Sequence, residues 1–236
     1  MKSVAARVKS KVDSLKEGEI FDYSSFNISD NEIEATAKAL SRLNGEGLIK
    51  RLSRGKYYKP KVSRFGELKP SENEILNKYV KNGYITGINL YNRLGLTSQV
   101  SNQIEVAINR RRSMIDLGST KIKFVKSNEE INYKNKKVLP ILDALKNVKK
   151  IPDADINNSI KILKTKLSQF DANTIKVICN SVLKYNPATR ALTGAILEEI
   201  DNNCAVKIRK SLNNLSSYYI GVSQEIVPNK IEWNII

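Results

Sequence analysis

The stretch SDNEIEATAKALSRLNGEGLIKRLSRGKYYKP, residues 29–60, decides how the N-terminal part of the chain folds. It begins with Ser29, followed three residues later by Glu32, a capping box in which each side chain accepts from the other residue's backbone amide. Apolar residues then recur at helical spacing until Gly45 ends the pattern. The sequence therefore predicts a helix that runs to about Asn44.

The two faces of this helix differ in chemistry. The expected inner face is small and apolar: Ile33, Thr36, Ala37, Leu40 and Leu43. The expected outer face carries hydrogen-bonding side chains: Asn31, Lys38 and Arg42, with Ser41 at its flank. Asn can make bidentate contacts with adenine, and Arg with guanine, in the major groove of DNA. We therefore expect this face to read base edges.

A basic hairpin follows the helix. Residues 48–52 and 56–59 read as two short strands, with a turn at 53–55 and Pro60 at the end. A helix followed at once by such a hairpin is typical of a winged helix-turn-helix. We expect its basic side chains to project next to phosphates, and Tyr57 and Tyr58 to alternate between inside and outside. The basic set is Lys50, Arg51, Arg54, Lys56 and Lys59. A small helical domain with a solvated hairpin is the alternative.

The sequence predicts an α+β, mostly helical protein of two domains, as the length of 236 residues favours. The first, at 1–61, is the winged helix-turn-helix, which opens with a helix at 3–15. A linker is expected at 62–70. The second, at 71–236, is a larger α+β domain with a helical bundle.

The C-terminal domain is expected to begin with a second capping box, formed by Ser71 and Glu74. Thr86 is expected to cap a further short helix. Strands are predicted at 104–108 and 122–125, and the region from about Val138 reads as mostly helical. Five helices are expected there, around 139–145, 156–167, 171–182, 187–196 and 204–215. Two final strands are predicted at 218–222 and 231–235.

A second group of basic residues lies around the two predicted strands: Arg110, Arg111, Arg112, Lys121 and Lys123. A run of charge is most often a solvated face. A second DNA contact and a docking site for an acidic protein are the other two interpretations. The sequence leaves all three open.

Composition narrows the functional classes. Lys and Arg number 40 and Asp and Glu 24, a net charge of +16 that favours an anionic partner such as nucleic acid. The sequence has no histidine, which removes Ser-His-Asp catalysis and imidazole metal sites. Gly118 and Ser119 match the start of a nucleotidyltransferase signature, but no paired aspartates follow closely. We therefore expect no enzyme activity, no metal and no cofactor.

The expected location is the cytoplasm. The basic N-terminus lacks a signal-peptide core, and no run of about 18 apolar residues suggests a membrane span. Cys179 and Cys204 are expected to be buried thiols in a reducing compartment, although a disulfide between them stays possible.

Two stretches resemble the AbiEi-type antitoxins of abortive-infection toxin–antitoxin systems. The first is ALSRLNGEGLIKRLSRGKYYKP at residues 39–60, and the second is NGYITGINLYNRLGLTSQVSNQIEVAIN at residues 82–109. The first stretch is shared in general form by many winged helices, and the second is more particular to these antitoxins. Together they cover about the first half of the chain.

The resemblance implies a function. Such antitoxins repress their own operon by binding repeated promoter sequences through the winged helix, which raises the question of cooperative self-association on DNA. Their C-terminal domain counteracts a toxin that resembles a nucleotidyltransferase. By motif position, Lys38, Arg42, Arg51, Arg54 and Lys56 would face double-stranded DNA here. The alternative is a stand-alone winged-helix regulator whose second domain senses a ligand or dimerises.

Overall fold

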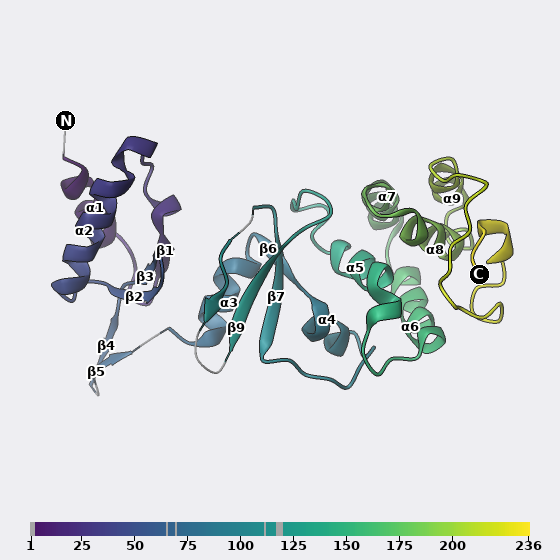
Figure 1. Ribbon diagram of the computed structural model, residues 1–236, viewed down its shortest axis with the longest axis horizontal. Coiled ribbons are helices and arrows are strands. Elements are labelled where there is room, and N and C mark those ends of the chain that lie inside the picture. Colours follow the sequence, from purple (N-terminus) through teal and green to yellow (C-terminus); the bar gives the residue numbers. More distant parts are fainter. Residues whose placement is uncertain (1–2, 65, 69, 111, 117–119) are drawn as a thin grey trace. The chain divides into compact units, whose positions relative to one another are not determined.

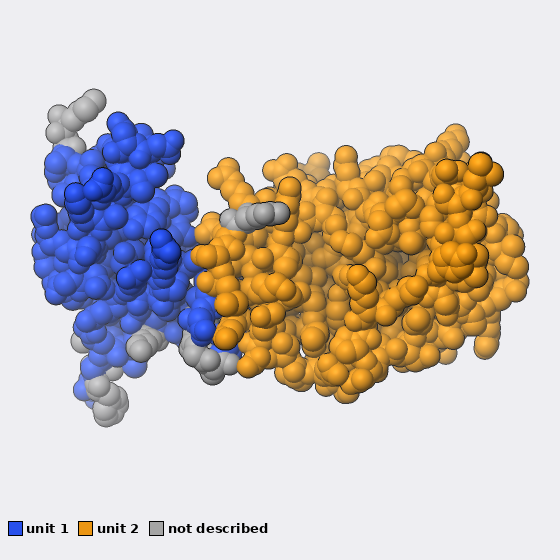
Figure 2. All heavy atoms as spheres, viewed as in Figure 1, with its two compact units in different colours: residues 1–79, 115–120 blue, residues 80–114, 121–236 orange. Residues whose placement is uncertain are grey.

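The computed structural model describes residues 3–64, 66–68, 70–110, 112–116 and 120–236 (Figure 1). Its helices and strands make it an α+β protein. The chain divides into two compact units, and Figure 2 colours them separately. Unit 1 comprises residues 1–79 and 115–120, and unit 2 comprises residues 80–114 and 121–236. Among the described residues, no helix has the length and apolar character needed to cross a membrane.

Unit 1 contains helices, 3-10 turns and short strands. Its elements are α1 (Val4–Asp13), β1 (Ile20–Asp22), the 3-10 turns η1 (Tyr23–Ser25) and η2 (Asp30–Glu32), α2 (Ile33–Gly45), β2 (Lys50–Ser53), β3 (Lys56–Tyr58), β4 (Lys61–Ser63), β5 (Gly66–Leu68), most of α3 (Glu72–Val80) and β8 (Ile115–Asp116).

Capping side chains set the helix starts in unit 1. The expected capping box at the entry to α2 is present, and the Ser29 amide donates to Glu32 Oε2 at 3.2 Å. The second expected box precedes α3, where the Ser71 amide donates to Glu74 Oε2 at 2.8 Å and the Glu74 amide donates to Ser71 Oγ at 3.3 Å. Both boxes satisfy amides that a helix start leaves without partners.

The core of unit 1 is where α1 and α2 pack on the sheet. Val8 and Val12 of α1 and Leu40 and Leu43 of α2 are buried in it. The Phe21 ring stacks on Tyr57 at a centroid distance of 6.0 Å. These side chains keep α1, α2 and β3 together by burying apolar surface.

Strand β3 lies in the middle of this sheet, whose order is β1-β3-β2. It pairs antiparallel with both neighbours, so that Tyr58 faces Ile20 on one side and Lys50 on the other. The tight turn between β2 and β3 requires Gly55, which has φ +72°. A Cβ there would also lie 3.2 Å from the Tyr23 ring.

Three expectations for unit 1 were wrong. Ile33, expected on the inner face of α2, is 48% exposed, because the buried stripe runs through Thr36, Ala39, Leu40 and Leu43. The segment 62–70, expected to be a linker, contributes to an antiparallel β4–β5 hairpin in which Lys61 pairs with Leu68. The division between the units accordingly falls at Tyr79 rather than at residue 70.

Unit 2 combines a mixed sheet with a helical bundle. The sheet strands are β6 (Gly83–Thr86), β7 (Gln103–Ile108) and β9 (Lys121–Lys126); β7 runs antiparallel to β6 and parallel to β9. The helices are α4 (Gly87–Arg93), α5 (Leu139–Asn147), α6 (Ile156–Ser168), α7 (Ala172–Ser181), α8 (Pro187–Leu197) and α9 (Asn202–Arg209), with 3-10 turns η3 (Val148–Lys150), η4 (Val182–Lys184) and η5 (Ile231–Trp233). The predicted strands 104–108 and 122–125 and the five later helices are thus present.

The C-terminal residues differ from the prediction. Helix α9 ends at Arg209 rather than near Leu215. Instead of two paired strands, the structure has a single bridge between Tyr218 and Ile235 and the turn η5. Asn234 adopts a left-handed conformation with φ 53°, which ends that turn and prevents a regular strand.

The carboxyl group of Asp143 on α5 is buried in unit 2. It accepts hydrogen bonds from Tyr84 Oη and Tyr185 Oη, each at 2.9 Å, and from Thr86 Oγ1 at 3.0 Å. Asn128 Nδ2 adds a fourth at 3.1 Å. Burial, followed by the charge of Asp143, raises the pKa of both tyrosine hydroxyls. Thr86 precedes α4, as predicted, but its hydroxyl bonds Asp143 instead of capping that helix.

Trp233 of the C-terminal segment packs against the helical bundle. Its indole Nε1 donates to Glu198 Oε2 at 2.9 Å, and the Arg209 guanidinium lies 4.4 Å from its ring centroid. The ring also requires Gly194 on α8, because a Cβ there would lie 2.2 Å from Trp233 Cζ3. Glycine at this position therefore lets the C-terminal segment approach α8 closely.

The two cysteines are buried free thiols in unit 2. Cys179 Sγ donates to the backbone oxygen of Cys204 at 3.6 Å. Burial raises the pKa of the Cys204 thiol.

Candidate nucleic-acid interface

The outward face of α2 and the turn before it carry four side chains that the sequence predicted as DNA-binding. Asn31, Lys38, Ser41 and Arg42 are all exposed. The Asn31 amide oxygen accepts from Ser29 Oγ at 2.6 Å, which leaves its amide hydrogens to donate elsewhere. Lys38 pairs with Glu34 at 3.0 Å, but both side chains are largely exposed, so this pair adds little to stability. This face, called the α2 basic face below, can donate hydrogen bonds to an anionic partner.

A groove of about 210 Å³ lies between α1 and α2, and Arg42 is the residue of the α2 basic face that borders it. Lys9 from α1 and Arg42 from α2 both line it, together with Glu46. Lys9 was not among the predicted site residues. From the sequence, its position outside the apolar stripe of α1 predicts only that the Lys9 side chain is exposed, and not that it lies beside Arg42.

The hairpin β2–β3, called the wing below, keeps two of its predicted basic residues at the surface. Arg51 and Arg54 are exposed, and Arg54 lies in the turn. Lys50 is half-buried, and its ammonium pairs with Glu67 of β5 at 3.3 Å. The wing therefore offers Arg51 and Arg54 to a partner, while Lys50 is engaged within unit 1.

The sequence also predicted exposed side chains on the second strand of the wing, and this was wrong. Lys56 is buried at 5% exposure, and Tyr57 and Tyr58 are both buried rather than alternating. All three residues of β3, the central strand of the sheet, are buried. Burial raises the pKa of the Tyr58 hydroxyl.

Lys59 serves α1 rather than projecting from the wing. Its ammonium donates to the backbone oxygens of Asp13 and Leu15, each at 2.9 Å, and of Val12 at 3.3 Å. These oxygens belong to the end of α1 and the residues that follow it, where a helix leaves carbonyls without partners and favours a cation. Lys59 is thus a structural cap.

The described residues of the second basic group do not form a single cluster. Arg110 and Arg112 are exposed beyond the end of β7, and Arg111 lies outside the described residues. Lys121 lies opposite Gln103 at the start of β7, and Lys123 pairs with Glu105 at 2.8 Å. Because β7 and β9 are parallel, Lys121 is at the opposite end of the strand pair from Arg110.

The described part of the chain contains no cluster of three or more His, Cys, Asp or Glu side chains arranged to hold a metal ion. Gly118 and Ser119, which matched the start of a nucleotidyltransferase signature, lie outside the described residues.

Residues 7–171 match the model of a family of unknown function, DUF6088. The chain belongs to this DUF6088 family. The match begins within α1 and continues into Asp171, so it includes the α2 basic face, the wing and the sheet of unit 2. A search of curated proteins found no match.

Proposed function

We propose that this DUF6088 protein is a DNA-binding transcriptional autorepressor and antitoxin of the cytoplasm. Unit 1 is a winged helix-turn-helix that binds repeated sites in its own promoter, with cooperative self-association on the DNA. Unit 2 counteracts a toxin that resembles a nucleotidyltransferase. The protein has no catalytic role and uses no cofactor.

The order of elements in unit 1 supports the first part of this proposal. A winged helix runs helix, strand, helix, helix, strand, strand, with the wing between the last two strands. Unit 1 runs α1, β1, η1, α2, β2, β3, and β3 occupies the centre of the sheet. The second helix is reduced to η1, a single 3-10 turn. In this interpretation α2 is the recognition helix.

The observation that carries the proposal is the exposed basic character of both recognition elements. Lys38 and Arg42 on α2, and Arg51 and Arg54 on the wing, are all exposed. We assign Arg42, on the recognition helix, to base edges, which supply specificity. We assign Arg54, on the wing, to phosphates, which supply affinity.

Unit 2 supports the partner role through its charge. It carries 24 of the 40 Lys and Arg residues but only half of the 24 Asp and Glu residues. Such an excess favours an acidic macromolecular surface. The toxin partner itself comes from the sequence resemblance.

DNA binding is tested by fluorescence anisotropy with duplexes taken from upstream of the chain's own gene. Replacing Arg42 with Gln should weaken binding by about 1–3 kcal/mol and blur sequence preference. With six to ten phosphate contacts, affinity should fall by roughly 10³–10⁵ between 50 and 200 mM salt.

The matched control for Arg42→Gln is Lys16→Gln, which removes the same charge from an exposed residue outside both recognition elements. It should leave binding unchanged apart from a small electrostatic loss. Binding that is insensitive to salt, or equal losses in the two variants, would contradict the proposal.

The antitoxin role is tested by co-expression with the neighbouring gene of the operon. If that gene encodes the toxin, its expression alone should arrest growth, and this chain should restore growth. Restoration should persist in Arg42→Gln, because antagonism is assigned to unit 2. Growth arrest that persists with the wild-type chain would remove the antitoxin role and leave a stand-alone regulator.

A further inference from the structure

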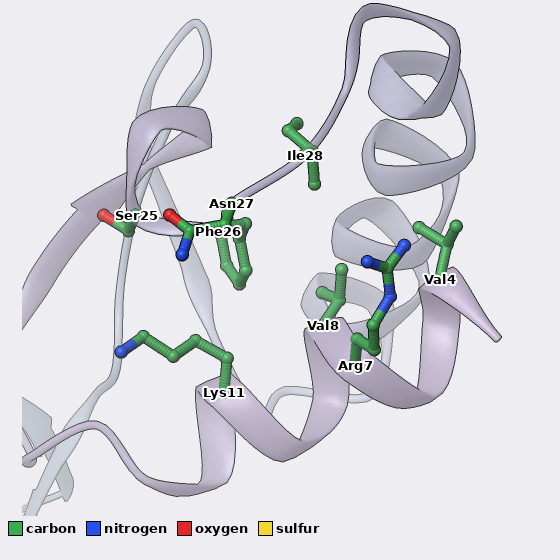
Figure 3. Close-up of a pocket in the computed structure, with 8 residues that line it drawn as sticks. All are labelled: Val4, Arg7, Val8, Lys11, Ser25, Phe26, Asn27 and Ile28. Atoms are coloured by element: carbon green, nitrogen blue, oxygen red, sulfur yellow. The ribbon is translucent and has the colours of Figure 1, made fainter. Parts of the chain in front are cut away.

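A cavity of about 260 Å³ lies in unit 1 between α1 and the segment of residues 25–28, which begins at the last residue of η1 (Figure 3). Its apolar wall is formed by Val4 and Val8 of α1 and by Phe26 and Ile28 of the facing segment. Val8 and Phe26 are core residues, so the wall is fixed by the packing of the unit. The cavity is therefore a preformed apolar recess.

Two cationic side chains line this cavity. Arg7 and Lys11 lie one helical turn apart on α1, and both line the cavity. The Lys11 side chain extends toward Ser25 and Asn27, which supply a hydroxyl and an amide on the facing segment (Figure 3). Among the residues that the structure describes, no acidic side chain pairs with Lys11. Its ammonium is available to an anion.

We propose that this cavity binds a small carboxylate with a short aliphatic or aromatic tail. The tail would lie against Val8 and Phe26, and the carboxylate would accept hydrogen bonds from Lys11 and Asn27. Binding sites for small molecules combine apolar walls with a few polar groups that fix orientation, as this one does. A volume of about 260 Å³ suits a ligand of the size of benzoate or hexanoate.

The cavity is also connected to the helix that carries the α2 basic face. Arg7 pairs with Glu32, and the same Glu32 carboxylate accepts from the Ser29 amide in the capping box before α2. Arg7 lines the same cavity as Lys11, so a carboxylate held by Lys11 and Asn27 competes with Glu32 for the Arg7 guanidinium and thereby changes the start of α2. Ligand binding is thereby coupled to DNA binding, a coupling that rests on the proposed function, whereas the site itself does not.

The site is tested without DNA, by isothermal titration calorimetry on the full chain. Benzoate and hexanoate are compared with benzamide and hexanamide, which have the same tails without the charge, and with inorganic phosphate, which has charge without a tail. Both carboxylates should bind about ten-fold or more tightly than their amides, since a hydrogen bond to a charged group is worth that much. Phosphate should bind more weakly than either carboxylate.

The variant Lys11→Gln should reduce carboxylate affinity about ten-fold and leave amide binding unchanged. Lys16→Gln, the matched charge control on an exposed residue outside the cavity, should leave both unchanged. Circular dichroism should show that both variants keep their fold. Equal binding of acids and amides, tightest binding by phosphate, equal losses in the two variants, or no binding at millimolar concentration would each overturn the site.

The coupling is tested by repeating the DNA titration with saturating benzoate. DNA affinity should change at least two-fold in the wild-type chain and stay constant in Lys11→Gln. Unchanged DNA affinity with benzoate bound would overturn the coupling alone. A chain that binds no DNA would overturn the coupling together with the proposed function, while calorimetry separately decides the site.

Discussion

The two units use polar side chains in opposite ways. In unit 1 the cations of the α2 basic face and the wing tip are exposed, and Lys38 has only an exposed ion pair. In unit 2 the Asp143 carboxyl group is buried and accepts four hydrogen bonds from three other parts of the unit. Exposed charges contribute little to stability, whereas a satisfied buried network contributes much. Substitutions in unit 1 should therefore alter binding, and substitutions at Asp143 should alter folding.

The largest effect is expected at Asp143. Replacing it with Ala leaves the three buried hydroxyls of Tyr84, Thr86 and Tyr185 without their acceptor and should destabilise unit 2 by about 3 kcal/mol or more. Urea unfolding followed by the fluorescence of Trp233, the only tryptophan in the sequence, would measure the loss in unit 2. DNA affinity should stay the same below the unfolding transition. A change of less than about 1 kcal/mol in the free energy of unfolding would contradict the proposed difference between the two units.

A smaller effect is expected at Lys59, a cation of unit 1 whose ammonium is bound by backbone oxygens of its own unit. Lys59→Met removes three hydrogen bonds to backbone oxygens after α1 and should cost about 1–2 kcal/mol. Arg54→Met, the matched change at the wing tip, should alter stability by less than about 0.5 kcal/mol while weakening DNA binding. Thermal unfolding by circular dichroism and the anisotropy assay separate the two. Equal destabilisation by both would show that the capping bonds of Lys59 contribute nothing.

The smallest effect expected is a dependence of stability on pH that arises from Glu74. The Lys61 ammonium and the Ser71 amide lower the pKa of this exposed carboxyl from 4.5 to about 2. A lowered pKa in the folded state means that the contribution to stability is complete above pH 4.5 and is lost as the pH falls toward about 2. The stability difference between wild type and Glu74→Gln should shrink over that interval, as measured by acid unfolding. A difference that is constant from pH 5 to pH 2 would contradict the shifted pKa.

Local chemistry made the helices predictable from sequence. Capping boxes at Ser29 and Ser71 and the apolar stripe of α6 each depend on residues a few positions apart. The β4–β5 hairpin was missed because its segment shows no clear alternation of apolar and polar residues. In addition, Gly66, the first residue of β5, has φ 110°, a conformation that cannot be read from the sequence.

The site was less predictable because its geometry depends on strands distant in sequence. Lys56 reads as a wing residue, but pairing of β1 and β2 on either side of β3 accompanies its burial. Arg110 and Lys121 are close in sequence, yet the parallel register of β7 and β9 places them at opposite ends. Exposure of Arg42, by contrast, follows from helical periodicity alone, and the structure agrees.

The contact between Trp233 and Gly194 has a consequence for synthesis of the chain. Unit 1 is almost complete at Tyr79, but α8 receives the indole ring only after the ribosome has added residue 233. Domains generally fold during translation in the order in which they emerge. The surface proposed to bind DNA is therefore formed early on the nascent polypeptide, while the bundle of unit 2 acquires the Trp233 ring only later.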